Sequence, residues 1–111
     1  MVTFLFQGIS GRQYAYLDRP WQDSTLSGEH GIYILAKGTV TDPVPVFIRD
    51  AISLRVALAL DLVQRNTAQS VHGASLLFVR SEPDTEKRLH ETLDLVAGYQ
   101  PVMNVPTSHE E

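Results

Sequence analysis

The sequence predicts a small α/β domain of the α+β kind, with a central three-stranded sheet, antiparallel or mixed, and helices beside it. One observation is the length, since 111 residues suffice for one compact domain with one core and not for two. A second observation is the order of strand-like and helix-like segments after residue 30. Short apolar and β-branched runs at 31–36, 44–48 and 76–79 predict three strands, and longer stretches at 53–65 and 81–97 predict two helices.

A β-hairpin is predicted before this core. The β-prone runs 3–7 and 12–17 flank a segment, 8–11, whose glycines are typical of a turn. Residues 18–30 carry proline, serine, aspartate and glycine without periodicity and are predicted to form a surface connection. The predicted division is one domain over 1–104, with the hairpin at 1–17, the connection at 18–30 and a core at 31–104, followed by an acidic tail at 105–111.

The strands at 31–36 and 44–48 are expected to pair as a second hairpin, because only a short turn-rich segment separates them. Pro43 and Pro45 lie at the start of the second of these strands. Proline cannot donate a hydrogen bond to a neighbouring strand, so this end is predicted to lie at a sheet edge or outside the pairing.

Each predicted helix has a recognisable start. Ser53 is a suitable N-cap for the first helix, which is apolar on most of its circumference and is therefore expected to be largely buried. Residues 81–84 supply a cap, a proline and two acids for the second helix, which is expected to run to about Ala97 and stop at Gly98. Its core face is predicted to consist of Leu89, Leu93 and Val96.

Composition excludes several classes of function. Nine Lys and Arg residues against thirteen Asp and Glu residues give a net charge of −4, whereas duplex-binding modules usually carry a basic surplus. The absence of cysteine excludes disulfides, thiol redox chemistry and cysteine-bound metals. The N-terminus lacks a secretion-signal pattern, and the longest nearly apolar run, 56–63, is too short to span a bilayer. We therefore expect a cytoplasmic protein without a membrane partner.

Several short motifs occur in a suggestive order. Gly31-Ile32-Tyr33 and Val46-Phe47-Ile48-Arg49 lie on successive predicted strands, Ser53-Leu54 opens a helix, and Leu95-Val96 precedes Pro101 and Asn104. Together they resemble the GIY-YIG nuclease superfamily over residues 31–104, and the hairpin before them looks like the N-terminal extension of some bacterial members. Asn104 resembles the terminal asparagine of that family, and we expect its side chain to bond backbone groups and tie the tail back.

The resemblance implies metal-assisted phosphodiester hydrolysis, in which two tyrosines position water, an arginine contacts the phosphate and a glutamate holds a divalent ion. The first tyrosine is present as Tyr33. The second tyrosine position holds Phe47, which has no hydroxyl, and the arginine position holds Ala57. Counting back along the last helix places the glutamate position at Thr92. Three of the four catalytic positions are therefore substituted.

Glu91 lies one residue before that fourth position. On an ideal helix it points about 160° away from Leu89 and is expected to face solvent, so no metal site is predicted. A one-residue shift of the register at Gly98 would instead make Glu91 the metal ligand, with Mg²⁺ or Mn²⁺ as the cofactor.

Two arginines are candidate contacts for phosphate or for a protein partner. A guanidinium forms two parallel hydrogen bonds with an oxyanion, which suits Arg49 and Arg55 to this role. For Arg49 the alternative is a salt bridge with Asp50 or Asp61. For Tyr33 the alternative to catalysis is a buried strand tyrosine whose hydroxyl has a partner.

Three functions stay open on the sequence. The favoured one is a catalytically degenerate GIY-YIG-like domain that serves as an interaction module with a protein partner, with weak nucleic-acid binding as an option. The second is an active metal-dependent endonuclease that uses Tyr33, Arg55 and Glu91 in shifted positions. The third is a small α/β adaptor or inhibitor unrelated to nucleases.

Overall fold

The computed structural model of the chain describes residues 2–21 and 28–104. The predicted acidic tail at 105–111 and residues 22–27 of the predicted connection lie outside the described residues. The elements are β1 (Thr3–Gln7), β2 (Gln13–Arg19), β3 (Gly31–Thr39), β4 (Asp42–Ala51), α1 (Leu54–Leu60), α2 (Leu62–His72), β5 (Leu76–Ser81) and α3 (Thr85–Tyr99). Within the described residues, no helix is long and apolar enough to cross a membrane.

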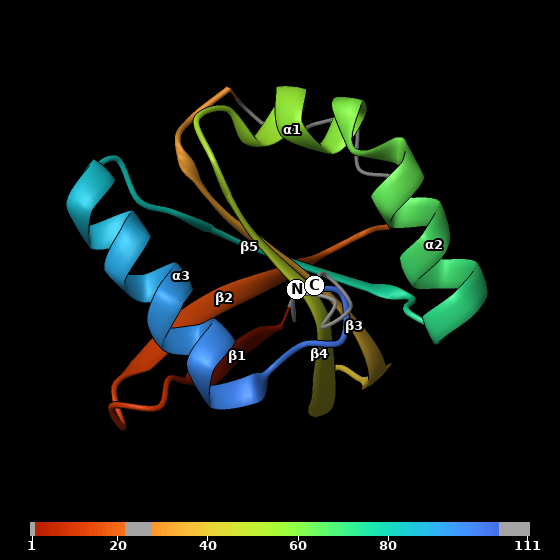
Figure 1. Ribbon diagram of the computed structural model, residues 1–111, viewed down its shortest axis with the longest axis horizontal. Coiled ribbons are helices and arrows are strands. Elements are labelled where there is room, and N and C mark those ends of the chain that lie inside the picture. Colours follow the sequence, from red (N-terminus) through yellow and green to blue (C-terminus); the bar gives the residue numbers. More distant parts are fainter. Residues whose placement is uncertain (1, 22–27, 105–111) are drawn as a thin grey trace, which may run out of the picture.

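The strands form one antiparallel sheet in the order β1-β2-β5-β3-β4 (Figure 1). The general α/β class is confirmed, but the expected three-stranded sheet is too small. The N-terminal hairpin joins the core sheet, because β2 pairs with β5 and places Leu17 opposite Val79. The sheet therefore has five strands, and its edges are β1 and β4.

The second hairpin pairs as expected, with Tyr33 of β3 opposite Arg49 of β4. A register shift follows Leu35, which is also the region where Pro43 and Pro45 lie. The expectation that these prolines lie at an edge is confirmed, since β4 pairs only with β3 and is the last strand of the sheet.

The segment after α3 covers the outer side of β4. The Asn104 side chain accepts a hydrogen bond from the Ile48 N–H at 2.7 Å and donates one to the Ile48 carbonyl at 2.8 Å. One residue earlier, the Met103 N–H donates to the Val46 carbonyl at 3.0 Å. This confirms the expected role of Asn104, which pairs with β4 as a neighbouring strand would.

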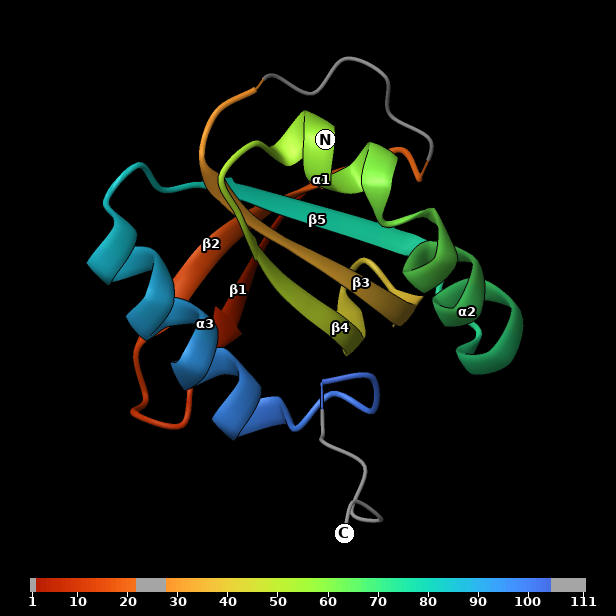
Figure 2. The ribbon, with the colours of Figure 1, turned by 45° about the horizontal axis from the view of Figure 1, so that its top comes forward.

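Helices cover both faces of the sheet: α1 and α2 lie on one face and α3 lies on the other (Figures 1 and 2). Side chains of β3 alternate between these faces. Tyr33 and Leu35 pack with α1 and α2, whereas Ile32 and Ile34 pack on the side of α3. The protein thus has two core layers, and the face of a strand residue decides which helices it meets.

The first predicted helix is two helices. Ser53 caps α1 as expected, and its side chain accepts a hydrogen bond from the Val56 N–H. The chain bends at Asp61, which ends α1, and α2 then continues to His72. The expectation that this segment is largely buried is wrong, because the sheet covers only one side of α1 and Leu60 on the other side is 76% exposed.

The last helix begins and ends later than expected, because Ser81 is the last residue of β5 and the helix starts only at Thr85. The Asp84 side chain caps α3, and the helix continues through Gly98 to Tyr99, where Gln100 adopts a left-handed conformation. A Cβ at residue 98 would lie 2.9 Å from the Ile9 nitrogen. Gly98 therefore serves the close approach of α3 to the β1–β2 turn and does not stop the helix.

The predicted core face of α3 is correct for Val96, which is partly buried against the core, and wrong for the two leucines. Leu93 is 58% exposed and Leu89 is exposed as well, whereas Arg88, Glu91 and Leu95 are buried against the sheet. These three residues recur at intervals of three and four, as one face of a helix requires. The prediction assumed that leucines, and not charged residues, face the core. Arg88 and Glu91 are nevertheless buried, because each has hydrogen-bonding partners on the sheet.

Candidate functional site

Tyr33, Arg49 and Asp61 form one polar cluster beneath α1 and α2. The Tyr33 hydroxyl donates to Asp61 Oδ2 at 2.5 Å, and Arg49 Nη1 donates to Asp61 Oδ1 at 3.2 Å. Tyr33 and Asp61 are buried, whereas the Arg49 side chain is 43% exposed. The salt bridge between Arg49 and Asp61 confirms that alternative, and Asp50 is excluded as the partner because successive strand residues point to opposite faces.

This environment keeps the Tyr33 phenol protonated. Burial, and then the hydrogen bond to Asp61 and its negative charge, raise the pKa of Tyr33 far above its ordinary value of 10.0. The hydroxyl is consequently a donor that Asp61 has already engaged. A tyrosine held in this way does not accept a proton from water at neutral pH.

We expect Tyr33 to ionise only when the protein unfolds. Its folded pKa lies above the unfolded value, so the stabilisation it provides is full below pH 10 and is lost as the pH rises further. Tyr33→Phe should leave the tyrosinate absorbance of the folded protein unchanged at about pH 11. In urea the same substitution should remove one of the four tyrosine signals. A loss of absorbance already in the folded state would contradict this assignment.

Two further positions implied by the resemblance lie near Tyr33. The Phe47 ring meets the Tyr33 ring edge-on, with centroids 6.1 Å apart, and Ala57 of α1 is buried in the same core cluster. Neither side chain carries a polar group. Arg55 is exposed on α1, and its Nη2 atom lies beside Gly28, away from the cluster of Tyr33.

Glu91 has a different place from the one expected. It was expected to face solvent, but it is buried between α3 and the sheet. The Tyr16 hydroxyl donates to Glu91 Oε2 at 2.5 Å, and Arg80 Nε lies 3.0 and 3.1 Å from its two oxygens. Burial, and then the charge of Glu91, raise the pKa of Tyr16 well above its ordinary value. Both carboxylate oxygens thus have partners within the protein.

The expected catalytic positions do not converge. Tyr33, Phe47 and Ala57 lie on the face of α1 and α2, whereas α3 lies on the opposite face of the sheet. Thr92 of α3 donates its hydroxyl to the Arg88 carbonyl, at 2.8 Å, within its own helix. Neither Thr92 nor Glu91 therefore shares a surface with Tyr33.

A second buried charged group was not anticipated. Arg88 is 3% exposed, and its Nε donates to Asp50 Oδ1 at 2.6 Å while Nη1 donates to the Glu82 carbonyl at 3.0 Å and lies 3.4 Å from His30 Nδ1. The sequence carries one signal for it: Arg88, Glu91 and Leu95 share one helical face. This group attaches α3 to the end of β4.

A polar hollow of about 370 Å³ lies beside Glu91, between the N-terminal hairpin, β5 and α3. It is lined by Arg12, Gln13, Tyr14, Arg80, Glu82, Lys87, His90 and Glu91. The Tyr14 hydroxyl donates to Asp94 at 2.8 Å, and burial followed by this hydrogen bond raises the pKa of Tyr14 to about 12. Among residues 2–21 and 28–104, no three His, Asp or Glu side chains gather closely enough to hold a metal ion.

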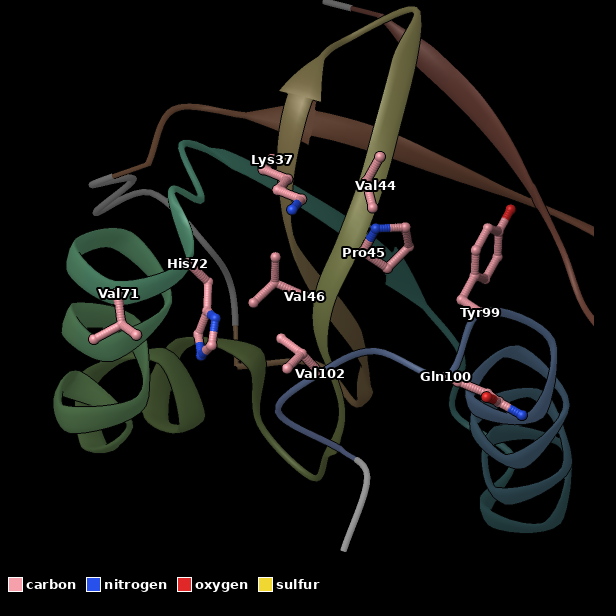
Figure 3. Close-up of a pocket in the computed structure, with 9 residues that line it drawn as sticks. All are labelled: Lys37, Val44, Pro45, Val46, Val71, His72, Tyr99, Gln100 and Val102. Carbon is pink, nitrogen blue, oxygen red and sulfur yellow. The ribbon is translucent and has the colours of Figure 1, made fainter. Parts of the chain in front are cut away.

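A second hollow, of about 390 Å³, lies along β4 near the end of α2 (Figure 3). Valines and a proline make up much of its lining, and no carboxylate belongs to it. Lys37 and His72 lie on one side of β4 in this view, and Tyr99 and Gln100 lie on the other. A catalytic or cofactor site requires polar groups that converge on one point. The polar groups of this hollow lie on opposite sides of β4 and do not converge.

Comparison with known proteins adds no relative. No protein-family model, no curated protein and no solved structure matches the chain. The assignment of function therefore depends on the geometry of the chain itself.

Proposed function

We propose that this chain is a GIY-YIG-like domain without nuclease chemistry, which functions by binding a protein partner. The likeness to the GIY-YIG family rests on the order of motifs over residues 31–104. One observation carries the absence of nuclease chemistry: the tyrosine and the carboxylate that hydrolysis would need lie on opposite faces of the sheet, and both are engaged in buried hydrogen bonds. Tyr33 donates to Asp61 beneath α1 and α2, and Glu91 accepts from Tyr16 and Arg80 beneath α3.

The chemistry of each side chain supports the same conclusion. Hydrolysis needs a metal ligand, a water-activating group and phosphate contacts that converge on one reacting position, at about 3 Å from it. Glu91 could bind a metal ion only if Arg80 and Tyr16 released it, which would leave a cation and a hydroxyl without partners in the core. Phe47 and Ala57 offer no replacement for the groups that the family uses.

The outer side of α1 is the surface that fits a partner. Five apolar side chains between residues 52 and 63 are exposed: Ile52, Val56, Leu60, Leu62 and Val63. Val56 and Leu60 are four residues apart and share one face of the helix. Surface helices usually carry polar residues on the side away from the core, and an apolar outer side is typical of an interaction site.

Charge indicates the kind of partner. The single charged residue of α1 is Arg55, which is exposed beside these apolar side chains. We therefore assign the partner as a protein segment that presents apolar side chains together with a carboxylate. The carboxylate would bond the Arg55 guanidinium at the rim, and the apolar side chains would cover Val56 and Leu60.

The nuclease part of the proposal is tested with supercoiled plasmid and Mn²⁺ or Mg²⁺. We expect the wild type to nick the plasmid no faster than Glu91→Gln does. We also expect calorimetry to detect no binding of either metal ion to the wild type. Thermal melting with and without Mn²⁺ supplies a readout that does not depend on the choice of substrate, because a bound ion raises the melting temperature. Nicking and a Mn²⁺-dependent rise that both vanish in Glu91→Gln would overturn the proposal.

The binding part is tested by a photo-crosslinking amino acid placed at Leu60, with the same group at Gln69, which is exposed on α2, as the matched control. We expect the probe at residue 60 to attach one protein, through a segment that contains apolar and acidic residues. Arg55→Glu should abolish this product, because it replaces attraction by repulsion. Attachment that is equal from both positions, or that survives Arg55→Glu, would contradict the assigned surface.

A further inference from the structure

We propose that the chain forms a two-fold symmetric dimer by pairing β1 with β1 of a second copy, which joins two five-stranded sheets into one. The proposal does not depend on the partner assigned to α1. It rests on the hydrogen-bonding direction of β1, on its composition and on the difference between the two edges of the sheet.

The outward backbone groups of β1 follow from its pairing with β2. The Asp18 N–H donates to the Val2 carbonyl, and the Gly8 N–H donates to the Arg12 carbonyl, so the even-numbered residues face β2. Hydrogen-bonded and outward-facing residues alternate in an antiparallel pair. The N–H and carbonyl groups of Thr3, Leu5 and Gln7 therefore point away from β2.

Among residues 2–21 and 28–104, only part of this outer edge has partners. The Gln7 N–H donates to the Tyr99 hydroxyl at 3.0 Å, and the next outward N–H, that of Ile9, donates to the Asp94 carbonyl at 3.1 Å. In the described part of the chain no strand lies beside Thr3 or Leu5, because β1 ends the sheet. Both residues are exposed, and Leu5 is 52% exposed.

The two edges of the sheet are built differently. The edge strand β4 contains two prolines and is covered by Met103 and Asn104, which bond Val46 and Ile48. Proteins commonly protect a free edge with a charge, a proline or a covering segment. The sequence of β1 is Thr-Phe-Leu-Phe-Gln and contains neither a charge nor a proline. Its exposed half is thus suited to accept another strand.

A second copy of β1 fits this edge better than an arbitrary strand. When Phe4 lies opposite its symmetry mate, Thr3 of each copy lies opposite Leu5 of the other. The outward N–H and carbonyl groups of Thr3 and Leu5 then all pair, which gives four hydrogen bonds between the copies. The Gln7 N–H, which already bonds Tyr99, is not needed for this pairing. The uncharged strands bring no like charges together, and the Phe4 rings extend the aromatic cluster with Phe6 and Phe78.

The test is the mass of the full chain in solution, by sedimentation from micromolar to millimolar concentration. We expect the wild type to rise from 12.4 kDa towards twice that mass. In Leu5→Lys the two lysines would be diagonal neighbours across the dimer, with Cα atoms about 7–8 Å apart, and repulsion between them should weaken association at least tenfold. Thr3→Pro, which removes an outward N–H that β2 does not use, should have a similar effect.

The matched control is Leu17→Lys. Leu17 is exposed on the same face as Leu5, but it lies on β2, whose two edges are both paired, so this variant should dimerise as the wild type does. Amide exchange of the wild type gives an independent readout: the amides of Thr3 and Leu5 should gain protection with concentration, and those of Phe4 and Phe6 should be protected throughout. A wild type that stays monomeric at millimolar concentration would overturn the proposal. So would a dimer that persists in Leu5→Lys but dissociates in Leu60→Lys, since α1 would then be the interface.

Discussion

Leu95→Ala is expected to lower the free energy of unfolding by about 2–5 kcal/mol, because it removes a side chain that is fully enclosed between α3 and the sheet. Leu95 packs in the core cluster with Phe6, Tyr16 and Ile34, so a truncation there leaves a cavity that rigid strands cannot fill. Urea denaturation followed by circular dichroism measures the change. The midpoint should fall while the slope stays unchanged.

The matched control for this prediction is Leu93→Ala on the same helix. Leu93 is 58% exposed, so its truncation should change the free energy of unfolding by no more than about 0.5 kcal/mol. The comparison is informative because the amino-acid pattern favours Leu93 as a core residue. Equal losses from the two variants, or a larger loss from Leu93→Ala, would show that α3 is rotated from the orientation described above.

Glu91→Ala is expected to destabilise the protein by about 3–5 kcal/mol, the range for breaking a buried ion pair. The substitution would leave the buried Tyr16 hydroxyl without its acceptor and Arg80 with Glu82, at 3.4 Å, as its carboxylate partner. Glu86→Ala is the control, because Glu86 is exposed in the first turn of the same helix. It should change the stability by no more than about 0.5 kcal/mol.

A second comparison at the same residue separates structure from metal binding. If Glu91 serves the fold, Arg80→Ala should also destabilise the protein, and the two losses should not add in the double variant, because both remove one interaction. A metal ligand would behave differently. Glu91→Ala would then abolish a Mn²⁺-dependent rise of the melting temperature and leave the melting of the metal-free protein almost unchanged.

The proposed functions place one binding surface on a face of the sheet, at α1, and the other at an edge of the sheet, at β1. The helices α1 and α2 contact β3 and β4, whereas the strand proposed for dimerisation is β1, beyond β2 and β5. Pairing through β1 would therefore leave both copies of the α1 surface accessible. A dimer of this kind would hold two partner segments at once, which raises the effective affinity for a partner that is itself dimeric.

The sequence by itself determined much of the local structure. Ser53 caps a helix where expected, Pro43 and Pro45 lie on an edge strand, and Asn104 ties the tail to the backbone. These features depend on residues close in sequence or on groups that a residue lacks, such as the N–H of proline. Local rules are therefore sufficient to predict them.

Only the tertiary structure decided which side chains face each other. Arg88 and Glu91 look like surface residues of α3, yet they are buried, because Asp50, Tyr16 and Arg80 on the sheet supply their partners. Burial of a charge depends on a partner that is distant in the sequence, and no helical period reveals it.

The same reason explains why the site could not be assembled from the sequence. Tyr33 and Glu91 are both present, but the face of a strand residue is fixed by which helices pack on each side of the sheet. The placement of α3 opposite α1 and α2 separates them. The amino-acid sequence thus contains a tyrosine and a glutamate of the kinds that hydrolysis uses, and the packing of the helices on opposite faces decided that they do not meet.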